Sequence, residues 1–251
     1  MRPLLLLSND DGYQAPGLAA IREALLPHAD VVICAPHSEQ SATSHALSLH
    51  RPLRLVPHGN AVYSLDGTPA DCVYVALHAE RRVLPRLPDL VVSGINHGVN
   101  LGDDVFYSGT VAAAREAALK GFPALALSAD GDASLEAAAQ VGAKLALALL
   151  REAPGRALLL NANFPAGSRW ELRGTRLGSR VYESGVEFRK DPRAREYLWI
   201  GGRGASHRPI AGSDTEAFDA GVVGVTPLVL DLWNRSELER VESLLDGVGA
   251  E

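Results

Sequence analysis

Two adjacent aspartates, Asp10 and Asp11, directly follow an unbroken apolar run near the start of the chain. The run, Leu4 to Leu7, shows no helical spacing, which is typical of a strand that is buried on both faces of a sheet. Gly12 then interrupts the chain, and apolar residues at helical spacing follow Pro16. The pattern predicts a central parallel strand that ends in two carboxylates, at the edge where ligands bind in open α/β sheets.

The acidic pair predicts a divalent metal ion. Two like charges held side by side repel each other unless a cation neutralises them, and carboxylate oxygens suit hard cations such as Mg²⁺ or Mn²⁺. The eight histidines lack HExxH spacing and the two cysteines lie far apart in the chain, which disfavours zinc. The competing interpretation is that Asp10 only caps the next helix or begins an Asx-turn before Gly12.

Strand-like and helix-like segments alternate over the first 165 residues. Apolar runs lie at 4–7, 31–35, 90–92, 124–127 and 158–160, and helical spacing occupies 16–26, 70–80, 110–120 and 134–150. This alternation predicts a Rossmann-like, doubly wound α/β fold with a mostly parallel sheet. Two short alternating runs within 53–65, separated by turn residues at 58–60, predict an inserted hairpin.

The pattern changes after residue 165. Residues 166–212 are rich in Arg, Gly and aromatic residues with poor helical periodicity, and 197–200 is their clearest strand. A β-branched run at 221–232 contains a proline that favours an edge position, and 236–245 has amphipathic helical spacing. We therefore expect a catalytic core at 1–165 and, at 166–251, a C-terminal extension with a hairpin, a strand and a terminal helix. Such a thin segment either packs against a second subunit or forms a small lobe of its own.

Two polar loops are expected beside the acidic pair, because the carboxyl ends of parallel strands meet at one edge. One loop covers 37–45, and the other, rich in Gly and Asn, covers 93–104. Their histidines, His37, His45 and His97, are candidate acids or bases, or simply solvated loop residues.

A possible phosphate seat follows the second loop. The run Ser108-Gly109-Thr110 opens a predicted helix, where free N–H groups and two hydroxyls could bind phosphate. Ser108 could equally be an ordinary helix cap.

Charge and composition restrict the function. A formal net charge of −6 disfavours binding to a nucleic-acid polymer, but not to a small phosphorylated ligand beside a metal ion. No apolar run is long enough to span a bilayer, and the N-terminal residues are expected to form a strand rather than a signal peptide. Cys34 and Cys72 lie in apolar runs and are expected to be buried thiols rather than a disulfide. We therefore expect a cytoplasmic protein with no membrane or nucleic-acid polymer as a partner.

The order of the motifs resembles one known family. The matching segments are Ser8-Asn9-Asp10-Asp11-Gly12, Ala35-Pro36 leading to Ser41, Gly67-Thr68-Pro69-Ala70-Asp71, Ser93-Gly94-Ile95-Asn96, Asn100-Leu101-Gly102-Asp103-Asp104 and Tyr107-Ser108-Gly109-Thr110. Together they resemble the SurE (survival protein E) family of 5′-nucleotidases, over nearly the whole chain. One departure is Gln40, where relatives usually carry arginine, and it leaves substrate preference near this loop open.

The resemblance implies a phosphatase with one divalent metal ion per subunit, Mg²⁺ or Mn²⁺. It implies hydrolysis of nucleoside 5′-monophosphates, with 3′-monophosphates and short polyphosphate as further candidates, and a homodimer or homotetramer built by exchange of the extension. The family's metal ligands fall on Asp10, Asp11, Ser41 and Asn96, and its phosphate contacts fall on Asn100, Ser108, Gly109 and Thr110.

Three residues have further candidate roles. We add Asn9, beside the acidic pair, to the candidate phosphate contacts. Asp10 and Asp11 are the candidate catalytic residues, either of them as the base toward water. Covalent attack by Asp10 is the alternative.

A receiver domain of a signalling protein is the alternative from a different class. Such domains also place an acidic pair and Mg²⁺ after their first strand, but they need a phosphate-accepting aspartate at the end of a later strand. Here Pro88-Asp89-Leu90-Val91-Val92 leads to Ser93, which cannot form an acyl phosphate. The sequence therefore favours metal-dependent hydrolysis.

Overall fold

A nine-stranded sheet forms the centre of the protein, in the order β3-β4-β2-β1-β5-β6-β7-β13-β8. The computed structural model describes residues 2–152, 157–182, 185–200, 205–246 and 248. Five neighbouring strands run parallel and are almost entirely buried: β2 (Asp30–Pro36), β1 (Leu4–Ser8), β5 (Leu90–His97), β6 (Ala124–Ala129) and β7 (Leu159–Phe164). The predicted Rossmann-like α/β fold is confirmed.

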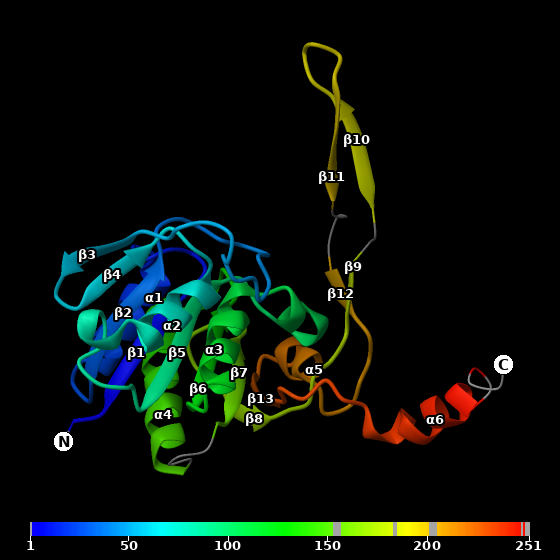
Figure 1. The fold of residues 1–251 in the computed structure, drawn as a ribbon. Coiled ribbons are helices and arrows are strands. Elements are labelled where there is room, and N and C mark those ends of the chain that lie inside the picture. Colours follow the sequence, from blue (N-terminus) through cyan, green and yellow to red (C-terminus); the bar gives the residue numbers. More distant parts are fainter. Residues whose placement is uncertain (1, 153–156, 183–184, 201–204, 247, 249–251) are drawn as a thin grey trace.

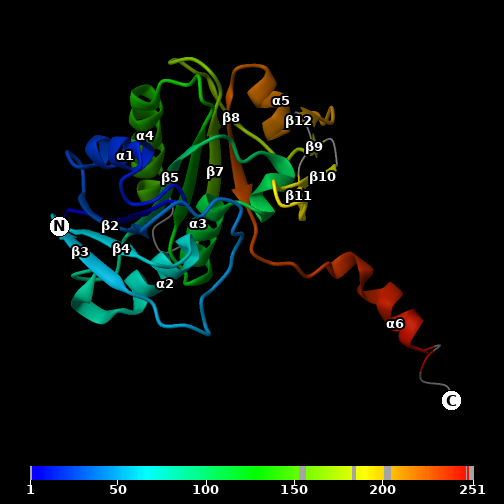
Figure 2. The ribbon, with the colours of Figure 1, turned by 90° about the horizontal axis from the view of Figure 1, so that it is seen from above.

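Helices cover both faces of this sheet (Figures 1 and 2). They are α1 (Pro16–Leu25) and α4 (Leu135–Glu152) on one face, and α2 (Pro69–His78) and α3 (Gly109–Leu119) on the other. Side chains alternate between the faces of a strand, so Leu5 and Leu7 pack in the first core while Leu4 and Leu6 pack in the second. This double burial explains the unbroken leucine run.

Strands β5 and β7 continue well past their predicted ends, residues 92 and 160. The additional residues of β7 include Asn161 and Asn163, which are buried but hydrogen-bonded to residue Asn100 of a loop. Since the amide groups of these side chains bond a distant segment, apolar periodicity alone could not extend the strand.

The predicted hairpin forms one edge of the sheet. Strands β3 (Leu55–Gly59) and β4 (Val62–Leu65) pair antiparallel, and β4 lies parallel to β2. The turn residues are Asn60 and Ala61, with φ of 50° and 58°, rather than the predicted 58–60. Positive φ at both positions is the type I′ geometry, which matches the twist of a hairpin.

The sheet continues past the predicted core boundary at residue 165. Strand β13 (Val223–Leu228) pairs antiparallel with β7, and β8 (Leu172–Gly174) pairs parallel with Val223 to Val225 of β13. Pro227 lies beyond the part of β13 that β8 covers, where its missing N–H costs no ladder hydrogen bond on that side. The short helix α5 (Asp214–Asp219) precedes β13. The division into a core and an extension stays a prediction.

Two parts of the extension project away from the sheet (Figure 1). One is an antiparallel ribbon of β9 (Arg180–Tyr182) with β12 (Ala205–His207) and β10 (Val186–Lys190) with β11 (Glu196–Ile200). The other is η3 (Arg235–Glu237) with α6 (Leu238–Asp246), the predicted terminal helix. Both carry exposed apolar side chains, among them Phe188, Leu198, Trp199, Ile200, Val241 and Leu244.

The structure also bears on the cysteines and on membrane-spanning segments. Cys34 and Cys72 are free and buried, as predicted. Within the described part of the chain, every helix is too short or too polar to cross a membrane.

Candidate functional site

Asp10 lies just past the end of β1, against the start of α3. It is only 5% exposed, and the Thr110 hydroxyl donates a hydrogen bond to its Oδ1. Gly109 packs so closely that a Cβ atom there would lie 2.8 Å from the Cβ of Asp10. Any larger residue at position 109 would push the helix away from the carboxylate, so this position requires glycine.

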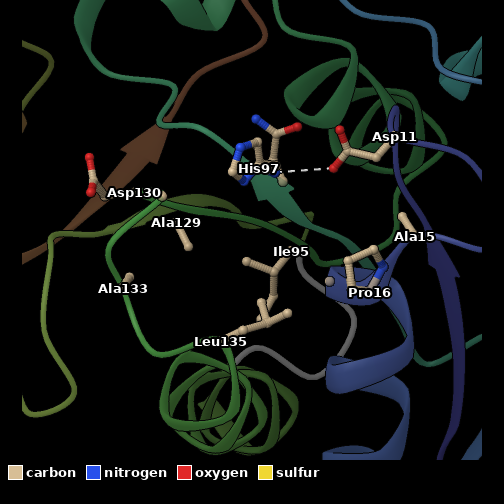
Figure 3. A pocket seen from close by; sticks show the side chains of 12 residues that line it. Asp11, Ala15, Pro16, Ile95, His97, Ala129, Asp130, Ala133 and Leu135 are labelled. Atoms are coloured by element: carbon tan, nitrogen blue, oxygen red, sulfur yellow. Dashed lines mark hydrogen bonds between the residues drawn. The ribbon is translucent and has the colours of Figure 1, made fainter.

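Asp11 is held on the opposite side, by the end of β5. Its Oδ2 accepts a hydrogen bond from the backbone N–H of His97 at 3.1 Å (Figure 3). The two adjacent carboxylates thus have different partners. Asp10 is held by α3, and Asp11 is held by β5 and lines a pocket beside α1.

The surroundings of Asp10 and Asp11 disfavour the ionised form of each carboxyl group. Burial raises the pKa of Asp10 to about 6, although the Thr110 hydrogen bond lowers it, and the charge of Asp11 raises it further. Burial likewise raises the pKa of Asp11. A cation between them would stabilise both ionised forms, which is the electrostatic condition for metal binding.

Of the other two candidate metal ligands, Ser41 lies in the loop after β2, and Asn96 lies near the end of β5. Gln40 donates its backbone N–H to the carbonyl of Asp10 at 2.7 Å, and this bond joins the loop that carries Ser41, the next residue, to the backbone of the acidic pair. Ser41 is exposed, and its hydroxyl donates to Glu39 at 2.7 Å. Asn96 is half-buried and uses its amide nitrogen to bond the carbonyl of Gly98, which leaves the amide oxygen for another partner.

The donor chemistry fits a hard cation. Asn9 is fully buried, and its Oδ1 makes no hydrogen bond while its Nδ2 donates to Gly12. An unpartnered oxygen beside two carboxylates is an unfavourable arrangement without a cation or a ligand donor. The described residues contain no group of three or more His, Cys, Asp or Glu that could hold a metal, so a site here has to use amide and hydroxyl oxygens as well.

The side chains of the predicted phosphate seat already have partners. Ser108 is the N-cap of α3, and its Oγ accepts from the N–H of Val111 at 3.1 Å. The Thr110 hydroxyl donates to Asp10. What this helix start offers to an anion is its first backbone N–H groups and its positive dipole end, next to Asp10.

Asn100 is the centre of a buried polar network. Its amide nitrogen donates to Ser128 at 2.8 Å, its backbone N–H donates to Asn163, and its carbonyl accepts from Asn161 and Asn163. The side chain of Asn100 therefore ties the loop after β5 to β6, and its backbone ties the same loop to β7. Sequence reasoning did not assign Asn161 and Asn163 to the site, although two asparagines two residues apart in a strand were the available signal.

Asp104 is a third residue that sequence reasoning did not assign to the site. Its carbonyl accepts from the N–H groups of Tyr107 and Ser108, each at 3.0 Å. Its carboxylate accepts from Arg180 and from the hydroxyl of Tyr182, each at 2.6 Å. Burial and this hydrogen bond raise the pKa of Tyr182 to about 12. The extension thus holds the segment that leads into α3, through partners 76 and 78 residues away in the chain.

The three candidate histidines have different surroundings. His45 bonds Glu116 of α3 at 2.8 Å and anchors the loop that carries Ser41. Burial raises the pKa of Glu116, but His45 and Lys120 lower it overall. His37 stacks on Tyr13, whereas His97 is exposed beside Asp11. Of the three, only His97 lines the pocket at the acidic pair.

Comparison with known proteins gives consistent matches. The family model described as survival protein SurE matches residues 5–184. The 5′-nucleotidase SurE of Sorangium cellulosum (strain So ce56) is 67% identical over 237 residues, covering 93% of this chain and 92% of that protein. The 5′-nucleotidase SurE of Citrifermentans bemidjiense is 45% identical, and the match covers 95% of this chain and 98% of that protein. The crystal structure of the SurE protein from Aquifex aeolicus is 38% identical with a TM-score of 0.84, and 97% of this chain and 100% of that chain are covered.

Proposed function

The chain belongs to the survival protein SurE family, and from this premise we propose that it hydrolyses nucleoside 5′-monophosphates to nucleoside and phosphate with a divalent metal ion. The observation that carries the proposal is the pair Asp10 and Asp11, two crowded carboxylates just past the end of β1, the first of them against the start of α3. The names of the curated relatives support the same enzyme class. Family membership also sets the receiver-domain alternative aside.

One metal ion per subunit, Mg²⁺ or Mn²⁺, would be held by Asp10, Asp11, Asn96 and Ser41. When bound, it supplies positive charge that stabilises the charge developing on the phosphate. Asn96 offers its amide oxygen as it stands, whereas Ser41 has to leave Glu39 to become a ligand.

The residues of the chain position the phosphate and move the proton. In this proposal the first N–H groups of α3, at Gly109 and Thr110, bind phosphate oxygens, and the hydroxyl of Thr110 orients Asp10; the position of these groups at the helix start and the Thr110–Asp10 hydrogen bond support it. We assign Asn9, Asn100 and Ser108 to the same phosphate site. Asp10 or Asp11 accepts the proton of the attacking water, with direct attack by Asp10 as the alternative.

We also propose activity on 3′-monophosphates and short polyphosphate, and a cytoplasmic homodimer or homotetramer. The exposed apolar side chains of β10, β11 and α6 support the assembly, because apolar patches of this kind mark interaction surfaces. In this proposal residues 1–165 are the catalytic core and residues 166–251 form the exchanged extension.

Phosphate release from protein stripped of metal by a chelator tests the proposal. We expect no hydrolysis of the substrate 5′-AMP until Mg²⁺ or Mn²⁺ is added, and slower turnover of the substrates 3′-AMP and tripolyphosphate. Full activity in the presence of excess chelator would contradict the metal requirement. Absence of phosphate release from every nucleotide with either metal would contradict the phosphatase assignment itself.

A further inference from the structure

A pocket of about 380 Å³ lies beside Asp11, between the start of α1, the end of β5 and the loop after β6 (Figure 3). This volume is within the range of pockets that enclose small organic ligands. Hydrogen bonds within the protein shape the walls. Gly98 donates its N–H to Ala129, Asp132 donates to the Asp130 carboxylate at 2.9 Å, and Ala133 donates to the carbonyl of Asp130 at 3.0 Å. The pocket is therefore formed before any ligand arrives.

The pocket is lined by apolar side chains on one wall and by polar side chains elsewhere. Apolar side chains make up one wall, contributed by Pro16, Ile95, Ala129, Ala133 and Leu135. Of the polar side chains, Asp11 lies at one end, Asp130 at the other and the exposed imidazole of His97 between them (Figure 3). Asn96 lines the pocket as well. All twelve lining residues belong to the described part of the chain, and none of them is lysine or arginine.

The acidic pair joins the pocket to the proposed phosphate site, because one aspartate belongs to each. Asp10 is bonded to Thr110 at the start of α3, whereas Asp11 lines the pocket, and the Cα atoms of adjacent residues lie only about 3.8 Å apart. One phosphate ester can therefore place its phosphorus at Asp10 and Asp11 and its alcohol in the pocket. The apolar wall suits a flat ring, and a carboxylate is a group that accepts hydrogen bonds from ribose hydroxyls.

We propose that this pocket receives the nucleoside of the substrate, with the base against the apolar wall and the sugar hydroxyls donating to Asp130. This inference rests on the proposed function, and it specifies where the leaving group of the hydrolysis, the nucleoside, binds. Since the lining has acidic side chains and no Lys or Arg, an uncharged nucleoside is accepted and a leaving group with its own phosphate is repelled. The pocket thus selects monophosphates over di- and triphosphates and polyphosphate.

Two variants test the pocket, each with a matched control. Ala133→Phe fills the apolar wall, and Ala19→Phe adds the same ring at an exposed position of α1 outside the pocket. Asp130→Asn removes the acidic acceptor, and the control Glu136→Gln removes an exposed carboxylate at the start of α4 that does not line the pocket. Calorimetry measures adenosine binding to the metal-free protein. Kinetics compare 5′-AMP, ADP and ethyl phosphate, whose small alcohol does not need the pocket.

We expect Ala133→Phe and Asp130→Asn each to weaken adenosine binding by about tenfold or more, and to raise the Michaelis constant for the substrate 5′-AMP to the same extent. The kinetics of the variants with ethyl phosphate should stay unchanged, and both control variants should behave like the wild type with every substrate. Asp130→Asn should lower the ratio of kcat/KM for 5′-AMP to kcat/KM for ADP. Unchanged adenosine binding and unchanged nucleotide kinetics in both pocket variants would overturn this inference while leaving the phosphatase intact. If no ester is hydrolysed by the wild type, the proposed function fails, and adenosine binding still decides whether the pocket takes a nucleoside.

Discussion

Arg180 donates a hydrogen bond from Nη1 to Oδ2 of Asp104 over 2.6 Å, and this contact joins the C-terminal extension to the segment that leads into α3. Both side chains are largely buried, at 17% and 13% exposure. The carbonyl of the same aspartate orders Tyr107 and Ser108. The start of α3, where we place the phosphate, is thus positioned by a strand far away in the sequence.

We expect Asp104→Asn and Arg180→Gln each to lower kcat/KM by about tenfold with 5′-AMP as substrate, since one hydrogen bond to a charged group contributes roughly 1.5–3 kcal/mol. The loss should be accompanied by weaker inhibition by inorganic phosphate, because the start of α3 is displaced. Asp103→Asn is the control, since Asp103 is exposed and its carboxylate accepts a hydrogen bond from the hydroxyl of Ser179 at 3.0 Å. Equal kinetics of all three variants and the wild type would contradict a positioning role.

Replacement of either aspartate of the proposed metal site should abolish turnover without unfolding the protein. Asp10→Asn and Asp11→Asn should each lower kcat more than about a hundredfold, because loss of a direct metal ligand should exceed the 10–100-fold effect of losing an outer-shell partner. Calorimetry should show lost Mn²⁺ binding, and circular dichroism should be unchanged. Glu23→Gln, on the exposed face of α1, is the control. Near-normal activity of both aspartate variants would refute the metal assignment.

The hydroxyl of Ser108 can be tested separately from its role as a helix cap. Ser108 and Ser213 are both N-caps whose Oγ accepts a backbone N–H at 3.1 Å. Changing either to alanine should cost about 0.5–2 kcal/mol of stability. We expect only Ser108→Ala to raise the inhibition constant of inorganic phosphate. If the inhibition constant of inorganic phosphate is the same for both variants, Ser108 acts only as a helix cap.

The raised pKa of Asp10 predicts a pH dependence of stability. This carboxyl titrates near 3.8 when unperturbed and near 6 in the folded protein, mainly because of burial. Between these values the folded state keeps a proton that the unfolded chain releases, so the stabilisation present at low pH is lost as the pH rises from about 4 to about 6. The shift corresponds to about 3 kcal/mol.

Urea unfolding of the metal-free protein at several pH values measures this dependence. The free energy of unfolding of the wild type should fall with rising pH relative to that of Asp10→Asn, in which position 10 no longer titrates. Parallel curves for the two proteins would show that Asp10 does not contribute. Added Mn²⁺ should restore stability above about pH 6, because the ion binds the deprotonated carboxylates of the folded state.

The terminal helix should mediate assembly. Truncation after Asp231 removes α6 but keeps β13, and Leu228 and Leu230 still pack against the core. We expect light scattering to show a dimer or tetramer for the full chain and a smaller assembly for the truncated one, with the thermal unfolding of the sheet largely kept. A monomeric full-length protein at micromolar concentration would contradict this prediction.

The order of strands and helices in the first 165 residues could be predicted because it depends on local periodicity. Leu4 to Leu7 and the helical spacing after Pro16 each indicate their element without reference to the rest of the chain. The acidic pair was predictable for the same reason, since residues after a central parallel strand lie at the ligand-binding edge. Helix α5 could have been predicted too, from the capping-box sequence Ser213 to Glu216.

Which side chains meet at the site was decided by the tertiary structure. Asn100 bonds to β7, Asp104 bonds to Arg180, and β13 inserts between β7 and β8, all through partners dozens of residues away. The spacing of apolar residues determines which face of an element is buried. It does not determine the hydrogen-bond partner of a buried polar group, because that partner depends on which distant segment the fold brings alongside.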